Sequence, residues 1–178
     1  MTVDRRKLIV GTFSAAAAAP AMVRAASSIA PASGLGDVDM LNVALGLEHE
    51  AIYAYTLAGG SGLLSAKAKE VGLEFQQSHE GHRDLLAKII RKKGGRPVLP
   101  AEKYGWNVPL SDEKDVLALA FQLEVGAARA YLSVVPKFDD RALSEGAARI
   151  MSDEVLHATV LRSVLGREIV PSFRLITA

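Results

Sequence analysis

A segment near the C-terminal end of the chain combines an apolar helical stripe with two side chains that can bind a metal ion. Glu154 and His157 lie three positions apart, so on a helix they are one turn apart on the same face. Ile150, Leu161 and Val164 share that face, which we expect to turn toward the core. A buried carboxylate needs a partner, and Glu-x-x-His suits a metal ion in helical bundles. Because chance matches to this motif are common, its interpretation depends on the rest of the chain.

Two other segments predict helices with one glutamate in the middle of an apolar stripe. They cover residues 37–60 and residues 111–135. We expect Asp37 or Asp39 as the N-cap of the first helix and Ser111 as that of the second, and paired glycines and a proline mark their C-terminal ends. Glu48 fills the open position in the first stripe, and Glu124 fills it in the second. The apolar members are Leu41, Leu45, Ile52 and Tyr55 in the first stripe, and Leu117, Phe121, Ala128 and Tyr131 in the second.

A further helix is predicted from Ser61 or Ser65 to Lys93, where a basic run precedes two glycines. His79 and His82 both occupy its inward face. The apolar members of that face are Phe75, Leu86 and Ile89. A single buried histidine is more often an ordinary core residue than a ligand, but three of the four histidines now lie on inward faces.

The connections predict how these helices assemble. The last helix should begin near Asp140 and end at Gly166, followed by a tail over residues 167–178. Residues 95–110 contain three prolines and form a long connection, whereas the other two turns are short. About 16 extended residues can span roughly 50 Å, and a helix of about 24 residues is roughly 36 Å long. We therefore predict an all-α, four-helix bundle over residues 37–166, with one long crossover between its second and third helices.

The N-terminal residues read as a targeting segment. Arg5 and Arg6 precede an apolar, alanine-rich stretch, and small residues before Ala25 form a cleavage site. We expect residues 1–25 to be a signal peptide that is removed. Residues 26–36 are small residues, proline and glycine, which predicts a flexible linker.

The paired arginines resemble a twin-arginine (Tat) signal, which exports proteins that have already folded. We therefore expect the Tat export machinery as a partner, a periplasmic or other extracytoplasmic location, and no stable membrane insertion after cleavage. Asp4 departs from the Ser or Thr usual before the arginines, so the general secretory route remains open. An uncleaved membrane anchor is a further alternative, because the apolar run is nearly long enough to span a bilayer.

Composition excludes several classes of function. The 178 residues are 49% hydrophobic and 23% charged, as expected for one globular domain. A net charge of +1 gives no indication of nucleic-acid binding. Cysteine is absent, which excludes disulfides, thiolate metal sites and thiol nucleophiles.

Four helices, one crossover and an inward carboxylate or imidazole on each helix resemble the ferritin-like superfamily over residues 37–166. Its di-iron and di-manganese members use a Glu from each of two helices and Glu-x-x-His from each of the other two. Four residues match that pattern by position: Glu48, Glu124, Glu154 and His157. The sequence Leu-Glu-His-Glu-Ala-Ile-Tyr-Ala-Tyr at residues 47–55 is also similar to exported bacterial ferritin-like domains, some of which are grouped with desiccation-related proteins.

The second helix departs from the pattern, because His79 stands where the resemblance implies a glutamate. The change removes one negative charge and one bridging carboxylate. The predicted metal ligands are Glu48, His79, His82, Glu124, Glu154 and His157, holding one or two Fe or Mn ions. A single-metal site with this mixture of nitrogen and oxygen ligands would also suit Zn.

The resemblance implies three functions. The first is redox chemistry with O2 or peroxide in an exported metalloprotein. The second is a structural or stress-protective bundle with weak or no metal binding, and the third is metal storage in a shell of many subunits. Tyr55 and Tyr131 could tune oxidants, although ordinary core packing is the simpler interpretation. A homo-oligomer is possible.

Overall fold

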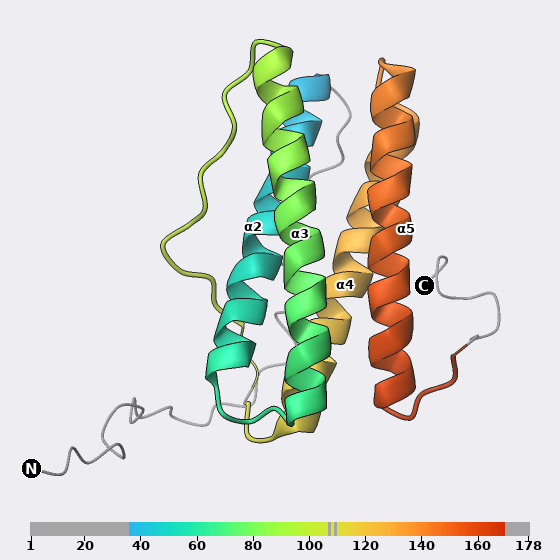
Figure 1. Cartoon of the computed structure of the whole chain (residues 1–178). Helices are drawn as coiled ribbons and strands as arrows, with labels where there is room; N and C mark the ends of the chain where they lie inside the picture. The colour runs from blue at the N-terminus through green and yellow to red at the C-terminus, as the bar shows by residue number, and fades with distance from the viewer. Residues whose placement is uncertain (1–35, 107, 109, 170–178) are drawn as a thin grey trace, which may run out of the picture.

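The computed structural model describes residues 36–106, 108 and 110–169. Within them the elements are α2 (Asp37–Gly60), α3 (Ala66–Lys92), α4 (Glu113–Val134), the short 3-10 helix η1 (Val135–Lys137) and α5 (Arg141–Val164). α2 packs along α3, α4 packs along α5, and α2 also contacts α4 (Figure 1). The described residues contain no strand, so the prediction of an all-α four-helix bundle with one crossover is confirmed. The predicted signal peptide, nearly all of the linker and most of the tail lie outside the described residues.

Side-chain caps begin three of the helices. The capping oxygens accept hydrogen bonds from first-turn N–H groups: Ser65 from Ala68 (3.3 Å), Asp112 from Asp115 (2.9 Å) and Asp140 from Ala142 (2.9 Å). The predicted cap at Ser111 was wrong by one position. Its backbone N–H instead donates to the carboxylate of Asp115 at 3.0 Å, which leaves Asp112 as the cap. α2 begins after Gly36 without a side-chain cap, so neither predicted aspartate has that role.

The crossover between α3 and α4 runs along the outer side of α2, as the yellow-green segment of Figure 1 shows. Asn42 fixes its start, donating to the carbonyl of Arg96 at 3.1 Å and accepting from the N–H of Val98 at 2.8 Å. Farther along α2, the ring of His49 lies 3.2 Å from the carbonyl of Val98, and Glu50 accepts the indole N–H of Trp106 at 2.9 Å. The predicted crossing of the bundle is therefore held in place by polar residues of α2.

The core consists of two apolar clusters at different heights in the bundle. Leu45, Ile90 and Tyr131 belong to one, and Tyr55 and Phe75 belong to the other. Along each long helix the ionisable residues come between members of the two clusters. The bundle therefore encloses a polar layer between two dry ones.

Five residues of the predicted stripes are not fully buried: Ile52, Ile89, Leu117 and Ala128 are partly exposed, and Val164 is exposed. Val164 is 58% exposed, because it lies in the last turn of α5. On α3 it is Ile90, and not the predicted Ile89, that is fully buried, because successive steps of four from His82 through Leu86 reach position 90. Ile89 packs against the cluster from its side.

Among the described residues, one helical stretch is long and apolar enough to cross a membrane by length and composition. It is Glu113–Lys137, with a mean hydropathy of 1.2. Its apolar face packs in the bundle, where Val116, Phe121 and Tyr131 are buried, and it carries the buried Glu124. The position of α4 in the core therefore accounts for its composition.

Candidate metal centre

Every long helix places at least one ionisable side chain in the polar layer. α2 contributes Glu48, α3 contributes His79 and His82, α4 contributes Glu124, and α5 contributes Glu154 and His157. None of the six is more than 8% exposed. The structure therefore brings together all six residues to which the sequence pattern pointed.

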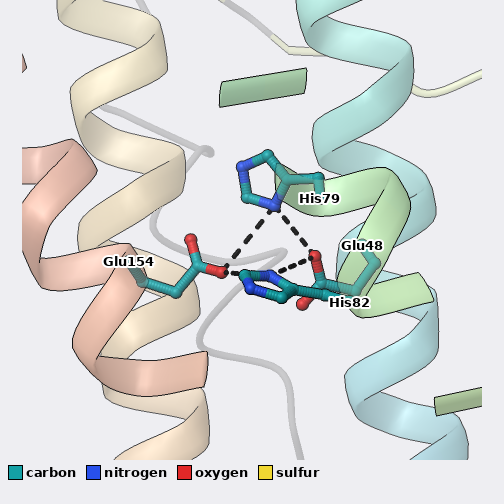
Figure 2. Close-up of side chains that lie close together, drawn as sticks. All are labelled: Glu48, His79, His82 and Glu154. Carbon is teal, nitrogen blue, oxygen red and sulfur yellow. Dashed lines mark hydrogen bonds and ion pairs between the residues drawn. The ribbon is translucent and has the colours of Figure 1, made fainter. Parts of the chain in front are cut away.

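The six side chains form two overlapping groups of four. One group contains Glu48, His79, His82 and Glu154, which point toward one another in Figure 2. The other group contains His79, Glu124, Glu154 and His157. Within each group, one nitrogen or oxygen atom per residue lies within 4.8 Å of the others. His79 and Glu154 belong to both groups, so they lie between two positions that a cation could occupy.

His79 spans the two groups with its two ring nitrogens. Nδ1 lies 2.8 Å from Oε2 of Glu48 and 3.7 Å from Oε1 of Glu154. Nε2 lies 3.3 Å from Oε1 of Glu124. The imidazole thus takes the central position where a carboxylate could bridge two cations.

Several buried polar atoms of the centre have no hydrogen-bond partner among the described residues. They are Nδ1 of His82 and His157, Oε2 of Glu124 and both carboxylate oxygens of Glu154. Each of them lies 3.3–3.7 Å from an atom of opposite charge in the centre, which is within ion-pair range but does not have hydrogen-bond geometry. Leaving such an atom unpaired costs about 1–3 kcal/mol, and more for a charged group. These atoms form a mixed nitrogen and oxygen donor set, which suits Fe, Mn or Zn. The residues present therefore fit a metal ion.

The charges of the centre compensate one another. Burial raises the pKa of Glu48 and Glu124, but the close contacts and positive charge of the histidines outweigh it and lower both pKa values below the usual 4.5. Burial also lowers the histidine pKa values, yet the carboxylates raise that of His82 to about 10 and that of His157 to about 9. For Glu154 burial dominates, and its pKa is raised. Protonated histidines thus supply the positive charge that a divalent cation could supply instead.

Two tyrosines orient the carboxylates, a role beyond the core packing that we favoured from the sequence. The hydroxyl of Tyr131 donates to Oε1 of Glu48, and that of Tyr55 donates to Oε1 of Glu124. Each tyrosine follows the glutamate of its own helix by seven positions and bonds the glutamate of the other helix. The seven-residue spacing is visible in the sequence, but the exchange of partners is not.

Sequence reasoning missed Asp153. Its Oδ2 lies 3.1 Å from Nε2 of His82, so Nδ1 of that ring is directed toward Glu48 and Glu154. A carboxylate behind a histidine fixes the orientation and tautomer of a metal-binding ring. The only signal in the sequence was its place directly before Glu154, at the edge of the inward face.

Toward the second apolar cluster, two aromatic rings stack on histidines of the centre. Phe75 stacks on His157 with a centroid distance of 4.2 Å, and Tyr55 stacks on His79 at 5.6 Å. These two rings are the members of the second apolar cluster that border the polar layer. Water is thereby excluded from that side, which strengthens the electrostatic interactions within the centre.

Four helices with one crossover, carrying carboxylates and imidazoles inward at the same height, define the class of ferritin-like bundles. The chain belongs to the ferritin-like domain family, whose profile matches residues 36–167. A solved structure of similar fold is that of a conserved hypothetical protein, rv2844, from Mycobacterium tuberculosis. It has a TM-score of 0.68 and 23% sequence identity, and the match covers 75% of this chain and 93% of that one. A search of curated proteins found no significant match.

Proposed function

We propose that the centre binds one or two Fe or Mn ions and supports redox chemistry with O2 or peroxide in an exported protein. The observation that carries this proposal is the set of unpartnered, buried nitrogen and oxygen atoms on His82, Glu124, Glu154 and His157. Such atoms destabilise a bundle unless something binds them. They converge from three helices on one small space, as metal ligands do.

Each of the two groups would hold one ion, with Glu154 in a position to contribute an oxygen to both. His79 limits this arrangement, because a neutral imidazole has a single lone pair and can ligate only one ion. We therefore expect one tight site and one weak site. A bound Fe or Mn ion supplies the one-electron chemistry that these side chains lack.

The surrounding residues prepare the centre for such an ion. Tyr131 holds Oε1 of Glu48, which leaves Oε2 facing His79 and His82. Tyr55 shares Oε1 of Glu124 with His79, which leaves Oε2 facing His157. The histidines must release their protons before they can bind metal. Asp153 holds His82 in the orientation that directs Nδ1 inward.

The second candidate function is a structural bundle in which the histidines and glutamates are bound only to one another. The observation that favours it is the contact of His79 with both Glu48 (2.8 Å) and Glu124 (3.3 Å), which needs no metal. An imidazolium in that position would serve as the cation of the centre. This reading predicts a stable protein with no metal requirement.

Metal content separates the two functions. Protein purified from its native compartment is analysed for bound elements, and metal-free protein is then melted with increasing Fe(II) or Mn(II) under reducing conditions at neutral pH. The metal hypothesis expects the melting temperature to rise with metal concentration, because a ligand that binds only the folded state stabilises it. Glu154→Ala should abolish this rise.

An oxygen-consumption or peroxide-turnover assay on the loaded protein then tests the redox step. Absence of bound metal together with no metal-dependent change in melting leaves the structural bundle as the function. Bound metal without turnover contradicts the redox part alone.

A further inference from the structure

A pocket of about 480 Å³ lies beside the centre, between α2, the crossover and α4. Four aromatic residues line it: Tyr53, Tyr55, Tyr104 and Trp106. Tyr53 of α2 packs against Tyr104 and Trp106 of the crossover, with ring centroids 5.3 and 5.9 Å apart. Most of the remaining wall is aliphatic and includes Leu57, Leu110, Val116, Leu119 and Leu123. The volume falls within the range of small-molecule sites, roughly 300–1,000 Å³.

The charge in the pocket has one sign. Among the described residues that line it, Lys103 is the single charged one, and none is an aspartate or glutamate. Within the described part of the chain, Lys103 has no ion-pair partner. The indole N–H of Trp106 is already bound by Glu50, so it makes no demand on a ligand. The pocket thus offers aromatic and aliphatic surface together with a lysine that has no ion-pair partner in the described part of the chain.

One residue, Tyr55, both lines the pocket and contacts the centre. Its hydroxyl donates to Glu124. A molecule in the pocket would therefore lie beside a residue whose hydroxyl contacts a candidate metal ligand.

We propose that this pocket binds a small, planar aromatic carboxylate, with its ring against Tyr53 and Trp106 and its carboxylate at Lys103. An aromatic ring suits the wall because rings attract one another in tilted and offset arrangements at centroid distances of about 4.5–7 Å. A negative charge suits the unpaired lysine. This site goes beyond the proposed function and does not depend on metal binding.

Trp106 provides a direct test, because it is the only tryptophan of the 178 residues. Full-length, metal-free protein is titrated with benzoate while the Trp106 emission is followed, and saturation-transfer NMR reports binding independently. We expect a saturable change. Cyclohexanecarboxylate, which lacks the aromatic ring, and benzyl alcohol, which lacks the charge, should each bind roughly two- to tenfold more weakly.

A pair of variants tests the role of the lysine. Lys103→Gln should weaken benzoate binding roughly two- to fivefold at low salt and leave benzyl alcohol unchanged. Lys137→Gln is the matched control, since Lys137 is an exposed lysine of η1 that does not line the pocket. No response to benzoate at about 10 mM, equal binding of the three compounds, or equal effects of the two variants would overturn the proposal. The comparison of compounds on unaltered protein remains decisive if a variant fails to fold.

Discussion

His79 limits how many cations the proposed metal centre could bind. Its Nδ1 and Nε2 lie near Glu48 and Glu124, so the ring stands between the two groups of candidate ligands. A carboxylate at this position could give one oxygen to each of two ions, whereas a neutral imidazole offers one lone pair. The change of one residue thus distinguishes a symmetric two-ion centre from one with unequal sites.

A carboxylate at position 79 should convert the weak second site into a tight one. We predict that His79→Glu raises the metal bound after anaerobic loading with Fe(II) or Mn(II) from about one ion per chain to about two. Elemental analysis of the desalted protein measures the ratio. Gln77→Glu, an exposed position on the same helix, is the control and should leave the ratio unchanged. Two tightly bound ions in the unaltered protein would contradict the role given to His79.

The tyrosine hydroxyls should contribute measurably to stability. Tyr131→Phe removes the donor to Glu48 and leaves a buried carboxylate oxygen unpaired, which we expect to cost about 1–3 kcal/mol of unfolding free energy. Urea denaturation of metal-free protein measures the loss. Tyr53→Phe, which alters a partly exposed tyrosine, should change stability by less than about 0.5 kcal/mol. Equal effects of the two variants would argue against the hydrogen bond as the cause.

Among the elements, the end of α3 and the start of the crossover are the most tightly constrained. Gly94 has a positive φ of 79°, which ends the helix in a conformation that favours glycine. At Gly95 a Cβ atom would collide with Val38 of α2 and would meet Ile90 at 3.0 Å. The two glycines therefore let the chain turn closely over the end of the bundle and run down the outside of α2.

The same substitution should have opposite effects at two glycines. Gly95→Ala is expected to destabilise the protein by about 1–3 kcal/mol, because the added methyl group overpacks the contact with Val38. Gly81→Ala, at an exposed position inside α3 with open space around it, should stabilise by about 0.5–1 kcal/mol through helix propensity. Thermal or urea unfolding measures both. A neutral Gly95→Ala would show that the turn has room to relax.

At the scale of the whole molecule, the centre is complete only when all four helices have met. The ligands come from positions as far apart as Glu48 and His157, and each buried charge is compensated only by residues of other helices or by a neighbouring turn. Such a centre forms together with the fold. The export that we propose would therefore suit the twin-arginine route, which carries folded proteins.

Export can be tested through the paired arginines. Replacing Arg5 and Arg6 by lysines should leave the precursor in the cytoplasm if the twin-arginine machinery recognises it. Cell fractionation locates the protein, and its intact mass reports whether residues 1–25 have been removed. Unchanged export of the lysine variant would indicate the general secretory route, and a retained N-terminus would indicate a membrane anchor. Lys7→Arg is a control, since it changes a basic residue outside the pair and should not affect export.

Helical periodicity was enough to predict the bundle and to place six ionisable residues on its inward faces. This was possible because the face of a helix on which a residue lies depends only on its position in the sequence. The long proline-containing segment predicted the crossover, because proline does not continue a helix. Residues typical of helix ends located most of the ends to within about two positions.

Contacts between helices could not be predicted in this way. Examples are the hydrogen bond from Tyr55 to Glu124, the contact of Asp153 with His82, and the contacts of His49 and Glu50 with the crossover. These contacts depend on how one element is rotated and shifted against another. Those parameters follow from the packing of complete side chains, which no single helix determines. The sequence by itself determined which residues face the centre, and only the tertiary structure decided which of them touch, because contact is a property of pairs of helices.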